Sequence, residues 1–137
     1  MILLDTHVLV WFTHGDSRLK EAARFLIEQA TLADEAVISP ISFWEVAMLV
    51  DKGKLPLGYR PIDWMHAILD GHGFRIEPLA PIIAIDAGSL PGDIHGDPAD
   101  RMIVATARHL GCPLLTNDQK ILDYAAAGFL QAIDACR

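Results

Sequence analysis

Residues 1–5, Met1-Ile2-Leu3-Leu4-Asp5, decide how the rest of the chain is interpreted, because a short apolar run ends there on an acid. The segment from Ile2 to Leu4 is continuously apolar, as expected of a strand that is buried on both faces of a parallel sheet. Asp5 follows directly and precedes Thr6 and a second apolar run. An acid in this position needs a partner, because burying an unpaired charge is costly. The segment therefore predicts a buried first strand that ends on a functional acid.

Three further motifs carry acids in comparable places: SFWEVAML at 42–49, GDPADRMIVATA at 96–107 and LLTND at 114–118. With Asp5, their acids Glu45, Asp100 and Asp118 either end a strand-like run or open a helix-like one. In a parallel sheet, strand C-termini and the N-termini of the following helices lie at one edge. Two unit charges about 4 Å apart repel by roughly 4 kcal/mol at an effective dielectric near 20. A cluster of four acids thus predicts a divalent-metal site.

Apolar periodicity along the chain alternates between strand and helix. This alternation predicts a three-layer α/β/α domain with a central parallel sheet. Besides the first strand, the expected strands are 36–39, 74–79, 113–115 and 129–133, and Pro78 confines the second of these to a sheet edge or a strand end. The expected helices begin after an N-cap at Ser17, run through 43–50, open at Pro61, and cover 81–90, 100–110 and 119–127, with an exposed loop at 91–96.

Two of these acids, and Asp97 near a third, also have a purely structural interpretation in helix capping. Ser42 and Glu45 have the spacing of a capping box, and Asp118 could cap the helix that follows it. Asp97 precedes Pro98, which is a common way to open a helix, so we expect Asp97 to be a cap. Asp97 also competes with Asp100 for the third ligand position. We prefer Asp100, because it directly precedes the apolar stretch of its helix.

Composition limits the class of protein. The 137 residues are expected to form one domain, 1–137, and 52% hydrophobic with 21% charged residues is typical of an ordered globular chain. No segment approaches the roughly 18 apolar residues of a membrane span. Two cysteines without CxxC spacing suit a reducing cytoplasm. The net charge of −7 argues against a duplex-wrapping protein. Basic residues gather in two places, where they are either solvated or contact a nucleic-acid backbone: Arg18, Lys20 and Arg24, and Lys52, Lys54 and Arg60.

The four motifs in this order resemble the PIN-domain nucleases along nearly the whole chain, most closely the small VapC-type toxins of toxin–antitoxin pairs. The resemblance implies a metal-dependent endoribonuclease that uses Mg²⁺ or Mn²⁺ and a metal-activated water. It places the acids of the family on Asp5, Glu45, Asp100 and Asp118 as catalytic residues and metal ligands. Thr116 matches a hydroxyl that the family uses near its last acid, and Thr6 and Asp97 are expected to support the ligands. It also implies an RNA substrate, an antitoxin partner and a homodimer, with helices around Trp44 and Trp64 as a possible interface.

Other functional classes fit less well. A phosphatase of the haloacid-dehalogenase type would need a second Asp two positions after the first, and His7 stands there. A receiver domain would carry an acidic pair and a late Lys, neither of which is found. A catalytically inactive binding module with the same fold remains an alternative. His95, two residues before Asp97, is either a solvated loop residue or part of the site lining.

Overall fold

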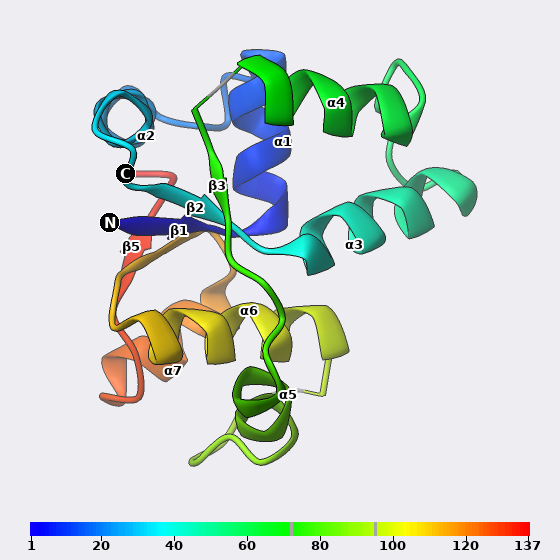
Figure 1. Cartoon of the computed structure of the whole chain (residues 1–137). Helices are drawn as coiled ribbons and strands as arrows, with labels where there is room; N and C mark the ends of the chain where they lie inside the picture. Colours follow the sequence, from blue (N-terminus) through cyan, green and yellow to red (C-terminus); the bar gives the residue numbers. More distant parts are fainter. Residues whose placement is uncertain (72, 95) are drawn as a thin grey trace.

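The computed structural model describes residues 1–71, 73–94 and 96–137, and its centre is a parallel sheet with helices on both sides (Figure 1). The described strands form a five-stranded sheet in the order β3-β2-β1-β4-β5, and every pairing is parallel. The strands are β1 Ile2–Leu4, β2 Ala36–Ile38, β3 Arg75–Ile76, β4 Leu114–Thr116 and β5 Ala132–Asp134. The predicted α/β class with a central parallel sheet is confirmed.

The helices form one layer on each face of the sheet. They are α1 Thr6–His14, α2 Glu21–Leu32, α3 Pro40–Asp51, α4 Pro61–Gly71, α5 Pro81–Gly88, α6 Pro98–Leu110 and α7 Gln119–Ala126. Helices α1, α2 and α4 lie on one side of the sheet, and α5, α6 and α7 lie on the other (Figure 1). Helix α3 leaves the end of β2 and contacts α1, α4 and α6. It therefore spans the two layers at the C-terminal edge of the sheet.

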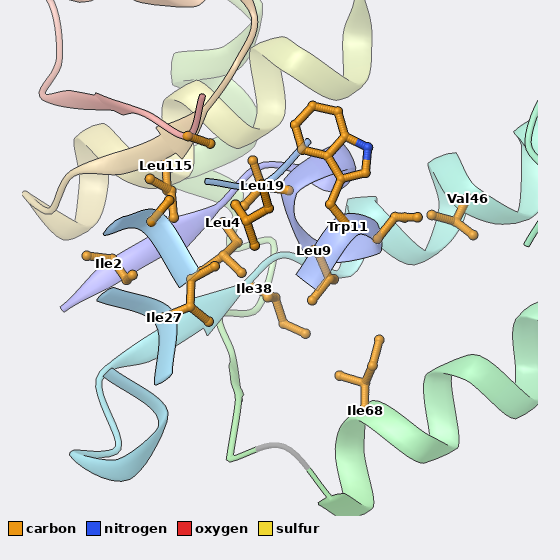
Figure 2. Close-up of a cluster of buried hydrophobic side chains, with 14 of the residues drawn as sticks. Ile2, Leu4, Leu9, Trp11, Leu19, Ile27, Ile38, Val46, Ile68 and Leu115 are labelled. Carbon is orange, nitrogen blue, oxygen red and sulfur yellow. The ribbon is translucent and has the colours of Figure 1, made fainter. Parts of the chain in front are cut away.

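Two hydrophobic clusters sandwich the sheet, because successive side chains of a strand point to opposite faces. Leu3 packs in the cluster with α5, α6 and α7, whereas Ile2 and Leu4 pack in the cluster with α1 and α2. Figure 2 shows the cluster on the side of α1 and α2, in which Leu4, Ile38 and Leu115 come from three neighbouring strands. Strand β1 is fully covered on both faces, as its continuous apolar sequence predicts. Asp5 is consequently fixed in position by a buried strand.

Side-chain caps open the helices that begin at the C-terminal edge. Asp5, Ser39, Asp97 and Asp118 are the N-cap residues of α1, α3, α6 and α7, and each side chain accepts a hydrogen bond from a backbone N–H at the start of its helix. The caps predicted at Asp97 and Asp118 are confirmed. Each cap satisfies N–H groups that have no partner within the helix.

Two predicted caps are wrong. Ser17 lies before α2, whose N-cap position is held by Lys20 without a side-chain hydrogen bond. Ser42 lies within α3, because Ser39 caps that helix and Pro40 opens it. Glu45 therefore lies beyond the first turn, where it cannot close a capping box with Ser42. Its burial has to be explained by the site and not by a cap.

Other differences follow from tertiary packing. The second apolar run, at 8–12, belongs to α1, which Asp5 caps at one end and Gly15 ends at φ 61°. The predicted strand at 74–79 shrinks to β3, which lies at a sheet edge as Pro78 requires, and the last strand begins three residues later than expected. Trp64, expected at an interface, is 1% exposed, whereas Trp44 is 52% exposed. No helix in the described part of the chain has the length and apolar character needed to cross a membrane.

Candidate metal centre

A pocket of about 330 Å³ opens at the C-terminal edge of the sheet. Its lining consists of Asp5, His7, Trp11, Glu45, Asp97, Asp100, Asn117 and Asp118. The four acids predicted to meet do so here, although they come from four separate segments of the chain. Asp97 lies with them, so the pocket holds both of the residues that competed for the third position.

Glu45 projects into the pocket from α3, which crosses the edge between the two helical layers. Its side chain is 9% exposed, and its Oε1 atom is buried without a hydrogen-bond partner among the described residues. A buried carboxylate oxygen that lacks a donor is costly, and such groups in native structures call for an explanation. A cation bound in the pocket would provide one.

The first turn of α6 brings two more carboxylates to Glu45. Carboxylate oxygens of Glu45, Asp97 and Asp100 all lie within 4.8 Å of one another, a spacing at which they could hold a metal ion. Asp97 accepts the N–H of Asp100 at 3.0 Å through its Oδ1 atom, which orients the two residues relative to each other. Arg101 anchors the same turn by donating to the carbonyl of Ala87 at 2.8 Å.

Asp5 is held through both of its carboxylate oxygens. One of its carboxylate oxygens accepts the N–H of Thr6 at 2.8 Å, and the other accepts the hydroxyl of Thr116 at 2.6 Å. Thr116 is fully buried and its hydroxyl also accepts the N–H of Asp118 at 3.0 Å. The Thr6 hydroxyl bonds that of Ser42 at 2.9 Å, which connects α1 to α3. The Thr116 hydroxyl and the Thr6 backbone N–H thus hold the Asp5 carboxylate, and the support of metal ligands by these residues stays a prediction.

Asp118 reaches the pocket from the end of β4 while it caps α7. Its Oδ1 atom accepts the N–H groups of Lys120 and Ile121 at 2.8 and 3.3 Å. These two bonds hold the Asp118 side chain in a fixed orientation in the pocket lining.

Crowding and burial raise the proton affinity of the other acids. Burial raises the pKa of Asp100 to about 8, and the charges of Asp5, Asp97, Asp118 and Glu45 add to the effect. Burial also raises the pKa of Asp5, although the bonds from Thr116 and Thr6 oppose it. The pKa of Glu45 is raised by burial and by the charge of Asp5. The pocket without a cation therefore favours protons, as expected of carboxylates that share one space.

Sequence reasoning missed three residues of the lining. His7 and Trp11 are four residues apart on α1 and therefore lie on one face of that helix. Asn117 directly precedes Asp118. The i, i+4 spacing of His7 and Trp11 could have revealed them, had the second apolar run been identified as a helix. The position suggested for His95 lies outside the described residues.

Comparisons with known proteins agree on one family. The PIN domain model matches residues 2–127. The chain is 35% identical over 120 residues to Ribonuclease VapC22 of Mycobacterium tuberculosis (strain ATCC 25618 / H37Rv), and the match covers 88% of both proteins. Among solved structures, DNA-bound VapBC from Salmonella typhimurium gives a TM-score of 0.70 at 18% identity, and FitAcB from Neisseria gonorrhoeae gives 0.67 at 19%. A toxin–antitoxin complex from Klebsiella pneumoniae gives 0.63 at 20%, and all three matches cover 98% of each chain.

Proposed function

The chain belongs to the PIN-domain family, and we propose that it is a divalent-metal-dependent endoribonuclease, the toxin of a toxin–antitoxin pair. The relative that is 35% identical is a ribonuclease by name, which supports RNA as the substrate. The similar solved structures include a toxin–antitoxin complex, which supports an antitoxin as the partner. The net charge of −7 does not by itself indicate RNA as the substrate. The acidic pocket is the part of the chain that can supply the chemistry of RNA hydrolysis.

The observation that carries this proposal is the buried Oε1 atom of Glu45, which has no hydrogen-bond donor among the described residues although Glu45 lines a pocket with four other acids. Glu45, Asp97 and Asp100 would hold the ion. Their ligand atoms are all carboxylate oxygens, which suit Mg²⁺ or Mn²⁺ and not metals that prefer sulfur or nitrogen. When bound, such an ion supplies charge neutralisation at the scissile phosphate and lowers the pKa of water for phosphodiester hydrolysis.

The protein side chains position the reacting groups around that ion. Thr6 and Thr116 fix both oxygens of Asp5, and each oxygen keeps a further lone pair. Asp5 can therefore accept a hydrogen bond from the attacking water and orient it. Asp118, held by its own cap contacts, also lines the pocket and can accept a hydrogen bond from the same water.

The partners are proposals of the same kind. We infer a homodimer and a cognate antitoxin in the cytoplasm, with an Arg-bearing antitoxin segment suited to the acidic pocket. Exposed apolar side chains are available for such contacts: Trp44 is 52% exposed on α3, and Ile85 is 70% exposed on α5. Light scattering of the isolated chain should give the mass of a dimer, and a strict monomer would contradict the homodimer.

Mapping RNA 5′ ends after expression of the wild type and of Asp5→Asn tests the nuclease. The wild type should produce new 5′-phosphate ends, with one or a few dominant sites. Asp5→Asn should reduce them by about a hundredfold or more, the size expected when a group that acts mainly in the transition state is lost. Asp70→Asn, an exposed acid at the end of α4, should cut like the wild type. Identical profiles in wild type and Asp5→Asn would leave the inactive binding module as the better reading.

A further inference from the structure

Arg18 packs against Trp11, a residue that lines the acidic pocket. Its guanidinium carbon is 5.1 Å from the centroid of the Trp11 ring, and Trp11 lines the pocket. Trp11 reaches the pocket because long helical side chains point back toward the helix N-terminus, where Asp5 caps α1. Figure 2 shows the Trp11 ring at the edge of the buried cluster. The pocket, the Trp11 ring and the Arg18 guanidinium are therefore neighbours.

The guanidinium of Arg18 is held in a fixed orientation. Nε and Nη2 donate to the carboxylate of Asp16, with the shortest contact at 2.7 Å, and the backbone N–H of Arg18 donates to the same carboxylate. Nη1 donates to no group in the described part of the chain, and the side chain is 67% exposed. An arginine whose plane is already fixed loses little side-chain entropy when it binds a phosphate.

Trp11 itself is covered, because only 5% of it is exposed. The outer surface offered to a ligand is therefore the guanidinium of Arg18 and not the indole. Single-stranded RNA is bound by contacts to phosphates and by stacking of unpaired bases on aromatic rings or on arginine planes. Arg18 can make both kinds of contact, one with Nη1 and one with its free face.

The charge of the pocket lining explains why a basic side chain is needed near it to bind RNA. Five of the described residues that line the pocket are acids, and of the lining residues only His7 can carry a positive charge. The phosphates of an approaching RNA strand are repelled by these acids. A cationic side chain near the pocket, such as Arg18, reduces this repulsion. Arg24 strengthens the positive character of the same region: it stacks on Phe12 at 5.7 Å and donates to the carbonyl of Asp16.

We propose that Arg18, stacked on Trp11, binds the RNA strand immediately beside the acidic pocket through a phosphate and the adjoining base. This inference rests on the proposed ribonuclease function and assigns one of its substrate contacts. It also separates the two basic groups of the sequence. Neither group lines the pocket itself, but Arg18 lies on Trp11, which does.

Binding of an end-labelled, mixed-sequence single-stranded RNA to the full chain tests the proposal. The measurement is fluorescence anisotropy across a salt series in Mg²⁺, on an Asp5→Asn background that is expected to slow cleavage by about a hundredfold or more. Arg18→Gln should weaken binding about tenfold, the scale of one hydrogen bond to a charged group. It should also reduce the slope of log K against log salt by about 0.7, which corresponds to one phosphate contact with a single strand. Arg18→Lys keeps the positive charge but loses the planar guanidinium, so its affinity should lie between those of the wild type and Arg18→Gln.

Arg75→Gln is the matched control. Arg75 is an exposed arginine on β3 that donates to the carbonyl of Asp34, so its substitution removes the same charge away from the pocket. It should change neither the affinity nor the salt slope beyond the error of the measurement. Melting temperatures of the variants exclude unfolding as the cause, and the salt slope is a readout that a merely structural role would not move.

Cleavage of the same RNA separates failure of this inference from failure of the proposed function. In the cleaving protein, Arg18→Gln should raise KM about tenfold with kcat nearly unchanged, because the contact lies outside the reacting atoms. Cleavage by the wild type with equal affinity, slope and KM for Arg18→Gln and Arg75→Gln would overturn the role of Arg18 alone. Binding that depends on Arg18 without any cleavage would overturn the ribonuclease and keep the contact. Absence of both binding and cleavage would overturn both.

Discussion

Among single residues, Thr116 has the largest structural role relative to its size, because one buried hydroxyl serves two acids. It donates to Asp5 at 2.6 Å and accepts the N–H of Asp118 at 3.0 Å. The bond to Asp5 also lowers the pKa of that carboxyl, against the effect of burial. A hydroxyl in this position keeps Asp5 both oriented and closer to the ionised state that water orientation requires.

Thr116→Val should destabilise the protein by roughly 2–5 kcal/mol, because it preserves the shape while leaving a buried acceptor and a buried donor without partners. Thr116→Ser keeps the hydroxyl and removes one methyl group, so it should cost only about 1 kcal/mol. Urea unfolding of the two variants beside the wild type measures both values. Equal losses for Val and Ser would mean that packing of the methyl group, and not the hydroxyl, determines the stability at this position.

Among the elements, α3 determines where Glu45 stands. The helix starts at the end of β2, is capped by Ser39 and contacts α1, α4 and α6. These contacts direct Glu45 toward the first turn of α6, where Asp97 and Asp100 lie. Since Ser39 is fully buried and its hydroxyl accepts the N–H of Ile41 at 3.2 Å, the cap contributes to the position of the entire helix.

Ser39→Ala should lower the free energy of unfolding by about 1 kcal/mol, the usual cost of losing a helix N-cap. Ser17→Ala is the matched comparison, because Ser17 occupies a cap-like place in the sequence but caps no helix in the structure. It should change stability by less than about 0.5 kcal/mol, as exposed substitutions usually do. Chemical denaturation distinguishes the two, and a larger loss for Ser17→Ala would contradict the assigned start of α2.

At the scale of the whole molecule, the acid pocket couples folding to protons and to metal. The pKa of Asp100 is about 8 in the folded chain, against 3.8 for an unperturbed Asp, and the pKa values of Asp5 and Glu45 are raised as well. Between pH 3.8 and about 8, the folded state therefore holds more protons than the unfolded state. Under that condition stability is highest below the unfolded pKa and decreases as pH rises through the folded pKa. The pKa of Asp16 is lowered from 3.8 to about 2, so its effect on stability changes only at pH values below this range.

The metal-free protein should therefore lose thermal stability as pH rises from about 4 to about 8, and Mn²⁺ or Mg²⁺ should restore it. The restoring effect should grow with pH, because metal competes with protons for the same carboxylates. Melting curves at several pH values, with and without millimolar Mn²⁺, measure both trends. Asp100→Asn should flatten the pH dependence and remove most of the metal effect. A melting temperature that ignores Mn²⁺ at the high end of the window would contradict a metal site in this pocket.

Local sequence was sufficient for much of the fold. The apolar runs of β1, β2 and β4, the helix openings at Asp97 and Asp118, and the edge position of β3 each depend on a few neighbouring residues, so they can be predicted without the rest of the chain. The convergence of Asp5, Glu45, Asp100 and Asp118 was also predictable, because the C-terminal edge of a parallel sheet is one place. Their roles as metal ligands and catalytic residues remain a proposal.

Tertiary structure alone decided the rest. Whether an apolar run such as that of α1 becomes a strand or a helix depends on what covers it, since short runs satisfy both patterns. Only packing could bring Glu45 beside the first turn of α6 and the Thr116 hydroxyl to an acid 111 residues away. Packing likewise set Arg18 on Trp11 and raised the pKa of Asp100. These properties depend on distances between segments and on exclusion of water, and neither is encoded in the residues next to the one concerned.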